Sequence, residues 1–366
     1  MNRRSFIKQA GVVGAGSLVA APLAAPAIAQ GNRTWRMVTT WPKNFPGLGV
    51  GAQRTADRIT AATGGRLTVQ VYSAGELVPA LQSLDAVIDG NAEMSHSTPY
   101  YWQNKSQGLN FVTGVPFGMN SRELATWMRY MGGQEIWDKI YDQFGLKGFL
   151  TGDTGTQAGG WFRNELNSLD DLKGIRFRTP GLGGQVWQKL GASVTNMAAG
   201  ETFQALQSGT LDAVEFVGPY NDLALGFYQI TKNYYVSSFV EAGAAMELVV
   251  SKEKFEELPQ DIQDIVRYVA QSEYDQVACD FYANDPRAMR TLVNDHGVKL
   301  LQFPDDILEA GAKAAGEILA ELRESGDPLT REMTESYIVA LSDLRERTER
   351  TDMPFLNARQ KFFSMS

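Results

Sequence analysis

Apolar segments with strand-like alternation and amphipathic segments with helical spacing follow one another along the first half of the chain. Residues 34–39, 67–72, 92–95 and 147–151 have the alternation of strands, and residues 52–62, 79–88 and 122–144 have the spacing of helices. Gly64 and Gly65 are expected to end the first of these helices. The alternation predicts an α/β protein.

The second half continues this alternation and then becomes mostly helical. Strands are predicted at 175–178, 193–197, 211–216 and 298–303, and helices at 256–282, 304–324 and 330–350. The chain is expected to leave a first lobe after the strand at 147–151. Its return is expected near Phe239 to Glu241.

The N-terminus looks like a twin-arginine export signal. Arg3 and Arg4 precede a weakly hydrophobic run over residues 10–25, and a small-x-small pattern predicts cleavage between Ala29 and Gln30. The alternative is a membrane anchor, but the apolar run is short and interrupted by Gly and Pro. We therefore expect the twin-arginine export machinery as a partner and the periplasm as the location.

Removal of this signal makes the chain more acidic and leaves enough residues for two lobes. Residues 1–29 hold three basic residues and no acid, so the net charge changes from -8 to -11. Such a chain has no electrostatic reason to bind nucleic acid. The remaining 337 residues exceed what one hydrophobic core usually spans. The predicted organisation is lobe I at 30–151, lobe II at 152–240, a return to lobe I at 241–282, completion of lobe II with a connecting helix at 283–325, and a C-terminal helical extension at 326–366.

Cysteine and histidine are scarce in the sequence. Cys279 is the one cysteine, so no disulfide forms within the chain, and its helical context predicts a small buried apolar residue. The two histidines, His96 and His296, are too few to favour thiol catalysis.

One internal similarity suggests how both lobes contribute to a shared cleft. Residues 80–96 resemble residues 205–215 when Gly90 is aligned with Gly209, and each segment is a predicted helix, a glycine and a short strand. His96 then takes the place of Glu215, and both would face the cleft, because ligands of open α/β sheets bind beyond the carboxyl ends of strands. Chance similarity of two helix-strand units is the alternative.

Four polar residues in the middle of the chain are the strongest candidates for a binding site. Gln157, Arg178, Glu215 and Glu241 each occur in a stretch rich in glycine, proline or aromatic residues, where a polar group at a strand end can face a ligand. One cation, two anions and an amide suit a small carboxylate and a metal ion. None of the four supplies a nucleophile.

Several longer stretches of the chain match a known pattern. They are Ser73-Ala-Gly-Glu-Leu-Val-Pro79, Tyr100-Tyr-Trp102, Thr154-Gly-Thr-Gln-Ala-Gly-Gly-Trp-Phe-Arg163, Ile175-Arg-Phe-Arg178, Ala213-Val-Glu-Phe-Val-Gly-Pro-Tyr-Asn-Asp222, Leu225-Gly-Phe227 and Tyr234-Tyr235. Together these stretches resemble the periplasmic solute-binding proteins of tripartite ATP-independent periplasmic (TRAP) transporters, in particular the subgroup that binds 2-oxo or 2-hydroxy monocarboxylates with a metal ion. The resemblance implies a two-lobe periplasmic binding protein fold with an interlobe ligand cleft, hinge crossings and long C-terminal helices. It also implies delivery of the ligand to membrane permease subunits.

The resemblance also implies roles for individual residues. Arg178 would hold the substrate carboxylate, because a guanidinium group offers two parallel donors to two acceptors. Gln157 would contact the substrate and could reach the metal through its carbonyl oxygen. Glu215 and Glu241 would bind the metal, with the backbone carbonyl of Phe216 as a further ligand.

The sequence departs from the common family pattern at two positions. Position 216 is Phe where Trp is common, which puts the preference for substrate side chains in doubt, and Asn221 precedes Asp222 where two acids are common. Aromatic residues are the candidates for the apolar wall, and Tyr101 is the preferred one. The candidates are Tyr100, Tyr101, Trp102, Trp161 and Phe216.

The predicted donors favour a hard cation. A 2-oxo or 2-hydroxy acid can chelate such an ion through its carboxylate and the oxygen on the neighbouring carbon, and all the protein donors are oxygens, which argues against zinc or copper. The two glutamates and the substrate carboxylate carry three negative charges, and Arg178 carries one positive charge. Ca²⁺ would neutralise the remaining negative charge, and Na⁺ would reduce it to -1. Sodium and calcium both remain open.

The sequence also allows two alternative functions and a homodimer. A periplasmic sensor subunit would bind the same acids but pass the signal to a receptor, and a metal-dependent lyase or aldolase would use a glutamate or His96 as a base. The second lacks a convincing acid-base pair. Phe355, Phe362 and Phe363 near the C-terminus could dock on a second copy and make a homodimer through the C-terminal helices.

Overall fold

A computed structural model describes residues 32–364. The predicted export signal at residues 1–29 and its cleavage site lie outside the described residues.

The first of two sheets has five strands in the order β2-β1-β3-β10-β4. β1 is parallel to both β2 and β3, whereas β10 is antiparallel to β3 and β4. β10 is the strand by which the chain returns to this sheet after forming most of the second one. The strands are β1 (Arg33–Thr39), β2 (Leu67–Tyr72), β3 (Met94–Ser97), β4 (Leu146–Asp153) and β10 (Ala245–Ser251).

The second sheet has six shorter strands in the order β11-β9-β5-β8-β6-β7. β6 is parallel to β7 and β8, while β5 runs antiparallel to β8 and β9. The strands are β5 (Gly160–Phe162), β6 (Arg176–Arg178), β7 (Ser193–Thr195), β8 (Ala213–Val214), β9 (Asn233–Tyr235) and β11 (Lys299–Leu301).

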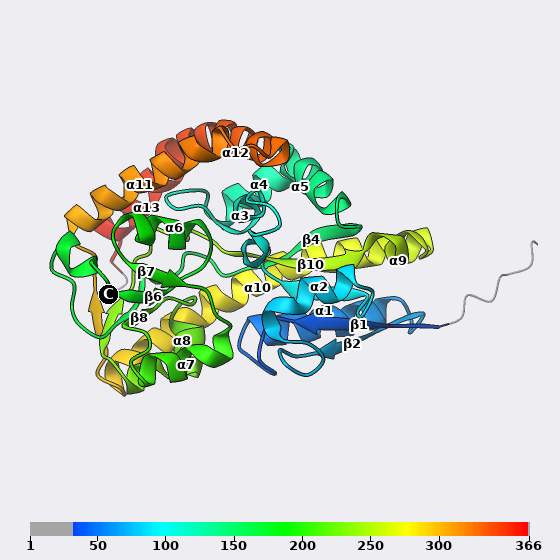
Figure 1. The fold of residues 1–366 in the computed structure, drawn as a ribbon, viewed down its shortest axis with the longest axis horizontal. Helices are drawn as coiled ribbons and strands as arrows, with labels where there is room; N and C mark the ends of the chain where they lie inside the picture. The colour runs from blue at the N-terminus through cyan, green and yellow to red at the C-terminus, as the bar shows by residue number, and fades with distance from the viewer. Residues whose placement is uncertain (1–31, 365–366) are drawn as a thin grey trace, which may run out of the picture. The chain divides into compact units, whose positions relative to one another are not determined.

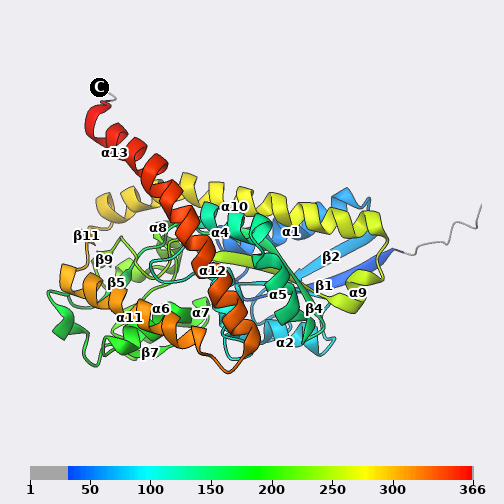
Figure 2. The same ribbon diagram turned by 90° about the horizontal axis from the view of Figure 1, so that it is seen from above.

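The chain passes between the sheets three times, and the two sheets lie side by side in both views of the ribbon (Figure 1, Figure 2). β4 leads to β5, β9 leads back to β10, and α10 (Gln260–Asn294) leads to β11. α10 packs on β4 and α1 of the first lobe and on α8 of the second. The predicted α/β fold with two lobes and hinge crossings is thus observed, while the exact lobe boundaries stay a prediction.

The remaining helices cover the sheets and form the C-terminal region. None of the described helices is both long enough and apolar enough to cross a membrane. The α-helices are α1 (Leu48–Ala62), α2 (Ser83–Ile88), α3 (Leu109–Thr113), α4 (Ser121–Tyr130), α5 (Gly133–Asp142), α6 (Gly181–Lys189), α7 (Ala199–Gln207), α8 (Pro219–Leu225), α9 (Lys252–Glu256), α11 (Asp305–Arg323), α12 (Pro328–Arg347) and α13 (Met353–Phe362).

Two predicted helices differ from those observed. The segment 122–144 forms two helices, because Gly132 takes a left-handed conformation with φ of 91° that ends the first one. The helix predicted at 256–282 begins later and continues through Pro286 to Asn294. Proline removes one internal hydrogen bond, but the buried residues Ala288 and Leu292 hold the last turns of the helix in place.

Cys279 is exposed, so its predicted burial is wrong. Val277 and Phe281 occupy the buried face of α10. Residues two positions apart in a helix point in nearly opposite directions, so Cys279 between them faces solvent.

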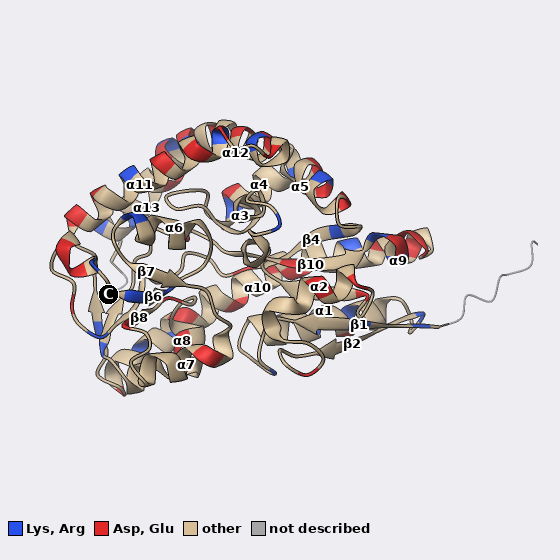
Figure 3. Cartoon of the chain, in the orientation of Figure 1, with Lys and Arg blue, Asp and Glu red and all other residues tan. Residues whose placement is uncertain are grey.

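The C-terminal helices carry charged residues along their length and end in exposed aromatic residues. Figure 3 shows acidic and basic positions side by side along α11 and α12. In Figure 2, α13 projects beyond α10, and none of its described residues is buried. Phe355, Leu356, Phe362 and Phe363 are all exposed there.

Candidate functional site

The four polar residues singled out in the sequence lie together between the two sheets. Gln157 is in the β4–β5 crossing, Arg178 ends β6, Glu215 directly follows β8, and Glu241 is in the β9–β10 crossing. All four are at most 2% exposed. The backbone N–H of Gln157 donates to the carbonyl of Glu241 at 3.1 Å, which joins the two crossings. Strand ends and crossings thus converge on one buried position.

Arg178 is fixed by backbone and aromatic groups and keeps donors free. Its Nε donates to the carbonyl of Met197 at 3.1 Å, Nη1 to the carbonyl of Glu215 at 2.6 Å, and Nη2 to the hydroxyl of Tyr101 at 3.3 Å. The guanidinium lies over the ring of Phe216, 5.1 Å from its centre. Since arginine has five N–H groups, these bonds leave one on each terminal nitrogen for a ligand.

The acidic and amide oxygens around Arg178 have no hydrogen-bond donors among the described residues. This holds for both carboxylate oxygens of Glu215, for Oε2 of Glu241 and for Oε1 of Gln157, all of them buried. Nη1 of Arg178 is 3.9 Å from Oε2 of Glu215, too far for a hydrogen bond. Buried acceptors without donors are rare and costly, so this cluster fits a group that supplies positive charge.

Burial and nearby negative charge raise the pKa of both glutamates. Burial raises the pKa of Glu215 to about 7, while Arg178 opposes the rise, Asp222 adds to it and the nearby hydroxyl of Thr179 also opposes it. Burial, followed by the negative charge of Glu215, raises the pKa of Glu241 well above its ordinary value. Two such carboxylates need either a proton or a cation.

The oxygens at this position, which are carboxylate, amide and backbone carbonyl oxygens, fit a hard metal ion. Within residues 32–364, no group of three or more His, Cys, Asp or Glu side chains is placed to hold a metal. A site here therefore depends on Glu215 and Glu241, with the Gln157 amide oxygen and the Phe216 carbonyl as neutral donors. That carbonyl accepts no hydrogen bond from the described backbone. Such a mixture suits calcium or sodium better than zinc.

Asp222 is a third buried acid beside this cluster, and its placement was not predicted. Oδ2 accepts hydrogen bonds from Nε1 of Trp161 at 3.0 Å and from the hydroxyl of Tyr234 at 2.8 Å, while Oδ1 has no donor among the described residues. Burial raises its pKa to about 7. The sequence signal was its place in the stretch that follows Glu215, where it was noted without a role.

A small cavity of 20 Å³ opens beside the cluster between the two lobes. It includes three of the predicted wall residues, Tyr100, Tyr101 and Phe216. Trp41 and Leu48 were not predicted, although Trp41 comes just after the carboxyl end of β1, where ligands of such sheets bind. The cavity is lined by Trp41, Leu48, Thr98, Tyr100, Tyr101, Thr154, Gln157, Phe216, Val217, Ala244 and Met246.

His96 does not line this cavity, contrary to the prediction from the internal similarity. It is fully buried in β3, and its Nδ1 accepts a hydrogen bond from Nε1 of Trp41 at 2.9 Å. Burial lowers the pKa of His96 to about 3, so the ring stays neutral. Trp41 therefore stands between His96 and the cavity.

Trp102 and Trp161, two other candidates for the cleft wall, belong to the core instead. Nε1 of Trp102 donates to Oε1 of Glu247 at 2.7 Å. Trp161 stacks on Tyr234 with ring centres 4.2 Å apart. Each indole is thus occupied by a structural partner, and neither lines the cavity.

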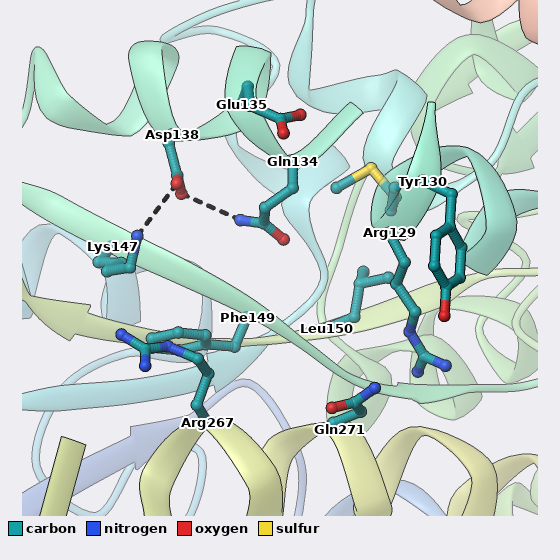
Figure 4. A pocket seen from close by; sticks show the side chains of 11 residues that line it. Arg129, Tyr130, Gln134, Glu135, Asp138, Lys147, Phe149, Leu150, Arg267 and Gln271 are labelled. Atoms are coloured by element: carbon teal, nitrogen blue, oxygen red, sulfur yellow. Dashed lines mark hydrogen bonds and ion pairs between the residues drawn. The ribbon is translucent and has the colours of Figure 1, made fainter. Parts of the chain in front are cut away.

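A larger hollow of 470 Å³ lies away from these residues, between α5, β4 and α10 (Figure 4). Two of its charged side chains, Asp138 and Lys147, are paired with each other. Nζ of Lys147 lies 3.0 Å from Oδ2 of Asp138, and Nε2 of Gln134 donates to Oδ1 of the same carboxylate at 3.0 Å. None of the predicted ligand residues lines this hollow.

Comparison with known protein families and curated proteins gives matches over most of the chain. The model of the family described as bacterial extracellular solute-binding protein, family 7, matches residues 37–325. A monocarboxylate 2-oxoacid-binding periplasmic protein from Nostoc sp. is 38% identical over 290 residues, which is 79% of each chain.

Three solved TRAP solute-binding proteins superpose closely. One from Pseudoalteromonas atlantica, with bound sodium and pyruvate, has a TM-score of 0.87 and 35% identity, covering 89% of this chain and 99% of that one. One from Colwellia psychrerythraea, with bound calcium and pyruvate, has a TM-score of 0.86 and 36% identity over the same shares. A third, from Bordetella bronchiseptica, is a mixed-occupancy dimer with a bound active site, holding copurified calcium and picolinate, and an apo site; it has a TM-score of 0.87, 30% identity, and coverage of 89% and 97%.

Proposed function

Since this chain belongs to family 7 of the bacterial extracellular solute-binding proteins, the receptors of TRAP transporters, we propose that it captures a small 2-oxo or 2-hydroxy monocarboxylate together with a sodium or calcium ion. Pyruvate and lactate are the simplest such acids. The protein is a binding component and not an enzyme, and it works with the membrane permease subunits of the transporter.

The observation that carries the ligand class is the set of buried oxygens without donors around one arginine. Arg178 and Gln157 would hold the substrate carboxylate, and Tyr101 would approach from the other lobe through its bond to Arg178. Glu215 and Glu241, with the Gln157 amide oxygen and the Phe216 carbonyl, would hold the ion. The ion would supply positive charge to two carboxylates that burial otherwise drives toward protonation.

Three finer features belong to the same proposal. Export through the twin-arginine machinery would place the protein in the periplasm, as its N-terminal sequence indicates. A homodimer through the C-terminal helices is supported by the exposed aromatic residues of α13 and by the dimeric relative from Bordetella bronchiseptica. The lobe boundaries predicted from the sequence would place the hinge at the β4–β5 and β9–β10 crossings.

A sensor subunit for the same acids is the second candidate function, because capture uses the same site. Genes for two membrane permease subunits beside this one would favour transport. The lyase or aldolase alternative loses one of its candidate bases, since His96 is buried behind Trp41.

The proposal is tested by calorimetric titration of the purified protein with pyruvate, 2-oxobutyrate, lactate and longer 2-oxo acids, with and without a chelator. We expect binding that requires calcium or sodium, weakens after chelation when calcium is the ion, and falls about 100-fold in Arg178→Ala, because two charge-assisted hydrogen bonds are lost. Arg176→Ala is the matched control, since Arg176 lies in the same strand, is exposed and pairs with Asp212 at 2.6 Å. Binding by none of these acids, or equal binding by Arg178→Ala, would refute the site.

A further inference from the structure

A turn of the first lobe contacts the second lobe next to the proposed ligand residues. The turn comprises residues 40–47, between β1 and α1. Nδ2 of Asn221, in α8, donates a hydrogen bond to the carbonyl oxygen of Pro46 at 2.8 Å. The ring of Phe45 packs edge-on against Phe216, with ring centres 5.8 Å apart. The turn is therefore joined to the second lobe by one polar and one aromatic contact.

These contacts connect directly to the binding site. Phe216 lies under the guanidinium of Arg178 and lines the cavity. Trp41, in the turn, and Leu48, the first residue of α1, line the same cavity from the first lobe. When the turn is held against the second lobe, it closes one wall of the space beside Arg178.

Asn221 is suited to this contact in a way that an acid would not be. A backbone carbonyl can only accept hydrogen bonds, so the partner of Pro46 must be a donor. Asn221 is fully buried, and water cannot replace the bond while the lobes are together. A carboxylate at this position would instead place two acceptors against each other.

We propose that Asn221 is a latch that sets how long the ligand stays bound, an inference that rests on the proposed function. A bond between two lobes exists only when they are closed, and contacts made only in the closed form shift the equilibrium toward it. When the lobes separate, water hydrates both the amide and the carbonyl. The bond therefore stabilises the closed, loaded form and slows release without touching the ligand.

A second set of bonds between the lobes offers a matched control. Nε2 of Gln185, in α6, donates to Oε1 of Gln103 at 3.3 Å and to Oε1 of Gln107 at 3.2 Å. All three glutamines are partly exposed, so water can replace these bonds when they break. Gln185→Ala should therefore affect ligand release much less than the loss of Asn221.

The test is stopped-flow fluorescence of pyruvate release, in the presence of calcium or sodium, for the full chain and its variants. We expect Asn221→Asp to release pyruvate about tenfold faster, with the association rate almost unchanged. Asn221→Ala, which removes the donor without adding charge, should change the release rate in the same direction. Gln185→Ala should stay within about twofold of the unsubstituted protein.

Thermal unfolding separates a latch from a residue that only stabilises the fold. The Tm of the ligand-free protein should be unchanged in Asn221→Ala, while the Tm gain on adding pyruvate and ion shrinks. Unchanged release rates, or an equal loss of Tm with and without ligand, would overturn the latch. If the unsubstituted protein binds none of the acids, the proposed function fails and the latch fails with it.

Discussion

Glu247 and Glu215 are equally buried and yet have opposite surroundings. Glu247, in β10, is 0% exposed, and its oxygens accept hydrogen bonds from Nε1 of Trp102 at 2.7 Å and from the hydroxyl of Tyr141 at 2.5 Å. Glu215 is 1% exposed, and neither of its oxygens has a donor among the described residues. Burial raises the pKa of each to about 7. Burial and pKa alone do not tell them apart.

The two carboxylates differ in whether the protein itself supplies their hydrogen-bond donors. The core of the first lobe provides Glu247 with its own partners, which is what a structural carboxyl requires. The interface between the lobes leaves Glu215 without partners, which is what a binding site requires. The hollow in Figure 4 is larger than the cavity between the lobes, and its Asp138 and Lys147 are paired with each other.

The sharpest way to break this comparison is to neutralise each glutamate separately. Glu215→Gln should weaken ion-dependent pyruvate binding by about 100-fold, because an anionic ligand of the ion is lost. Its unfolding temperature without ligand should be unchanged or higher, since an unpaired buried carboxyl is removed. Glu247→Gln should lower the unfolding temperature and leave the affinity within about threefold, because only a structural hydrogen-bond pair is disturbed. Calorimetry and thermal unfolding of both variants measure the two effects.

The opposite pattern would contradict the interpretation. If Glu247→Gln abolished binding while Glu215→Gln only reduced stability, hydrogen-bond satisfaction would not distinguish structural from ligand-binding carboxyls here. Glu257→Gln provides a control, because Glu257 is exposed and belongs to neither region.

A second prediction concerns the pH dependence of stability contributed by Glu247. Its pKa is about 7 in the folded protein and near its ordinary value of 4.5 when unfolded, so the folded state binds the proton more tightly. The stabilisation is therefore complete below pH 4.5 and is lost as the pH rises through 7. Between these limits, the unsubstituted protein should lose several degrees of Tm relative to Glu247→Gln. A Tm difference that does not vary between these pH limits would show that Glu247 does not titrate there.

Much of the fold could be predicted because its signals are local. Alternating apolar positions gave most strands, and polar residues in strand ends and crossings identified Gln157, Arg178, Glu215 and Glu241, which the structure brings together. The break at Gly132 and the extension of α10 past Pro286 depend on conformation and packing that spacing does not show.

The parts that could not be predicted depend on contacts between distant segments. His96 matched Glu215 in register, but the hydrogen bond from Trp41, 55 residues away, keeps it behind the wall. Glu247 is a single acid within an apolar strand, and nothing local indicates that Trp102 and Tyr141 satisfy it. The exposure of Cys279 depends on which face of α10 meets the lobes.

The smallest expected effect concerns the choice of ligand within the site. Phe216 forms part of the cavity wall, between Arg178 on one side and Phe45 on the other. Phe216→Trp should leave pyruvate binding within a few-fold but weaken 2-oxo acids with longer side chains by about tenfold, because a larger ring reduces the space beside the carboxylate. The ratio of the two affinities, measured by calorimetry in the same ion, is the readout. An unchanged ratio would place the selectivity elsewhere on the wall, with Trp41 and Met246 as the next positions to vary, while Arg178 and the unpaired oxygens would still account for binding of the acid.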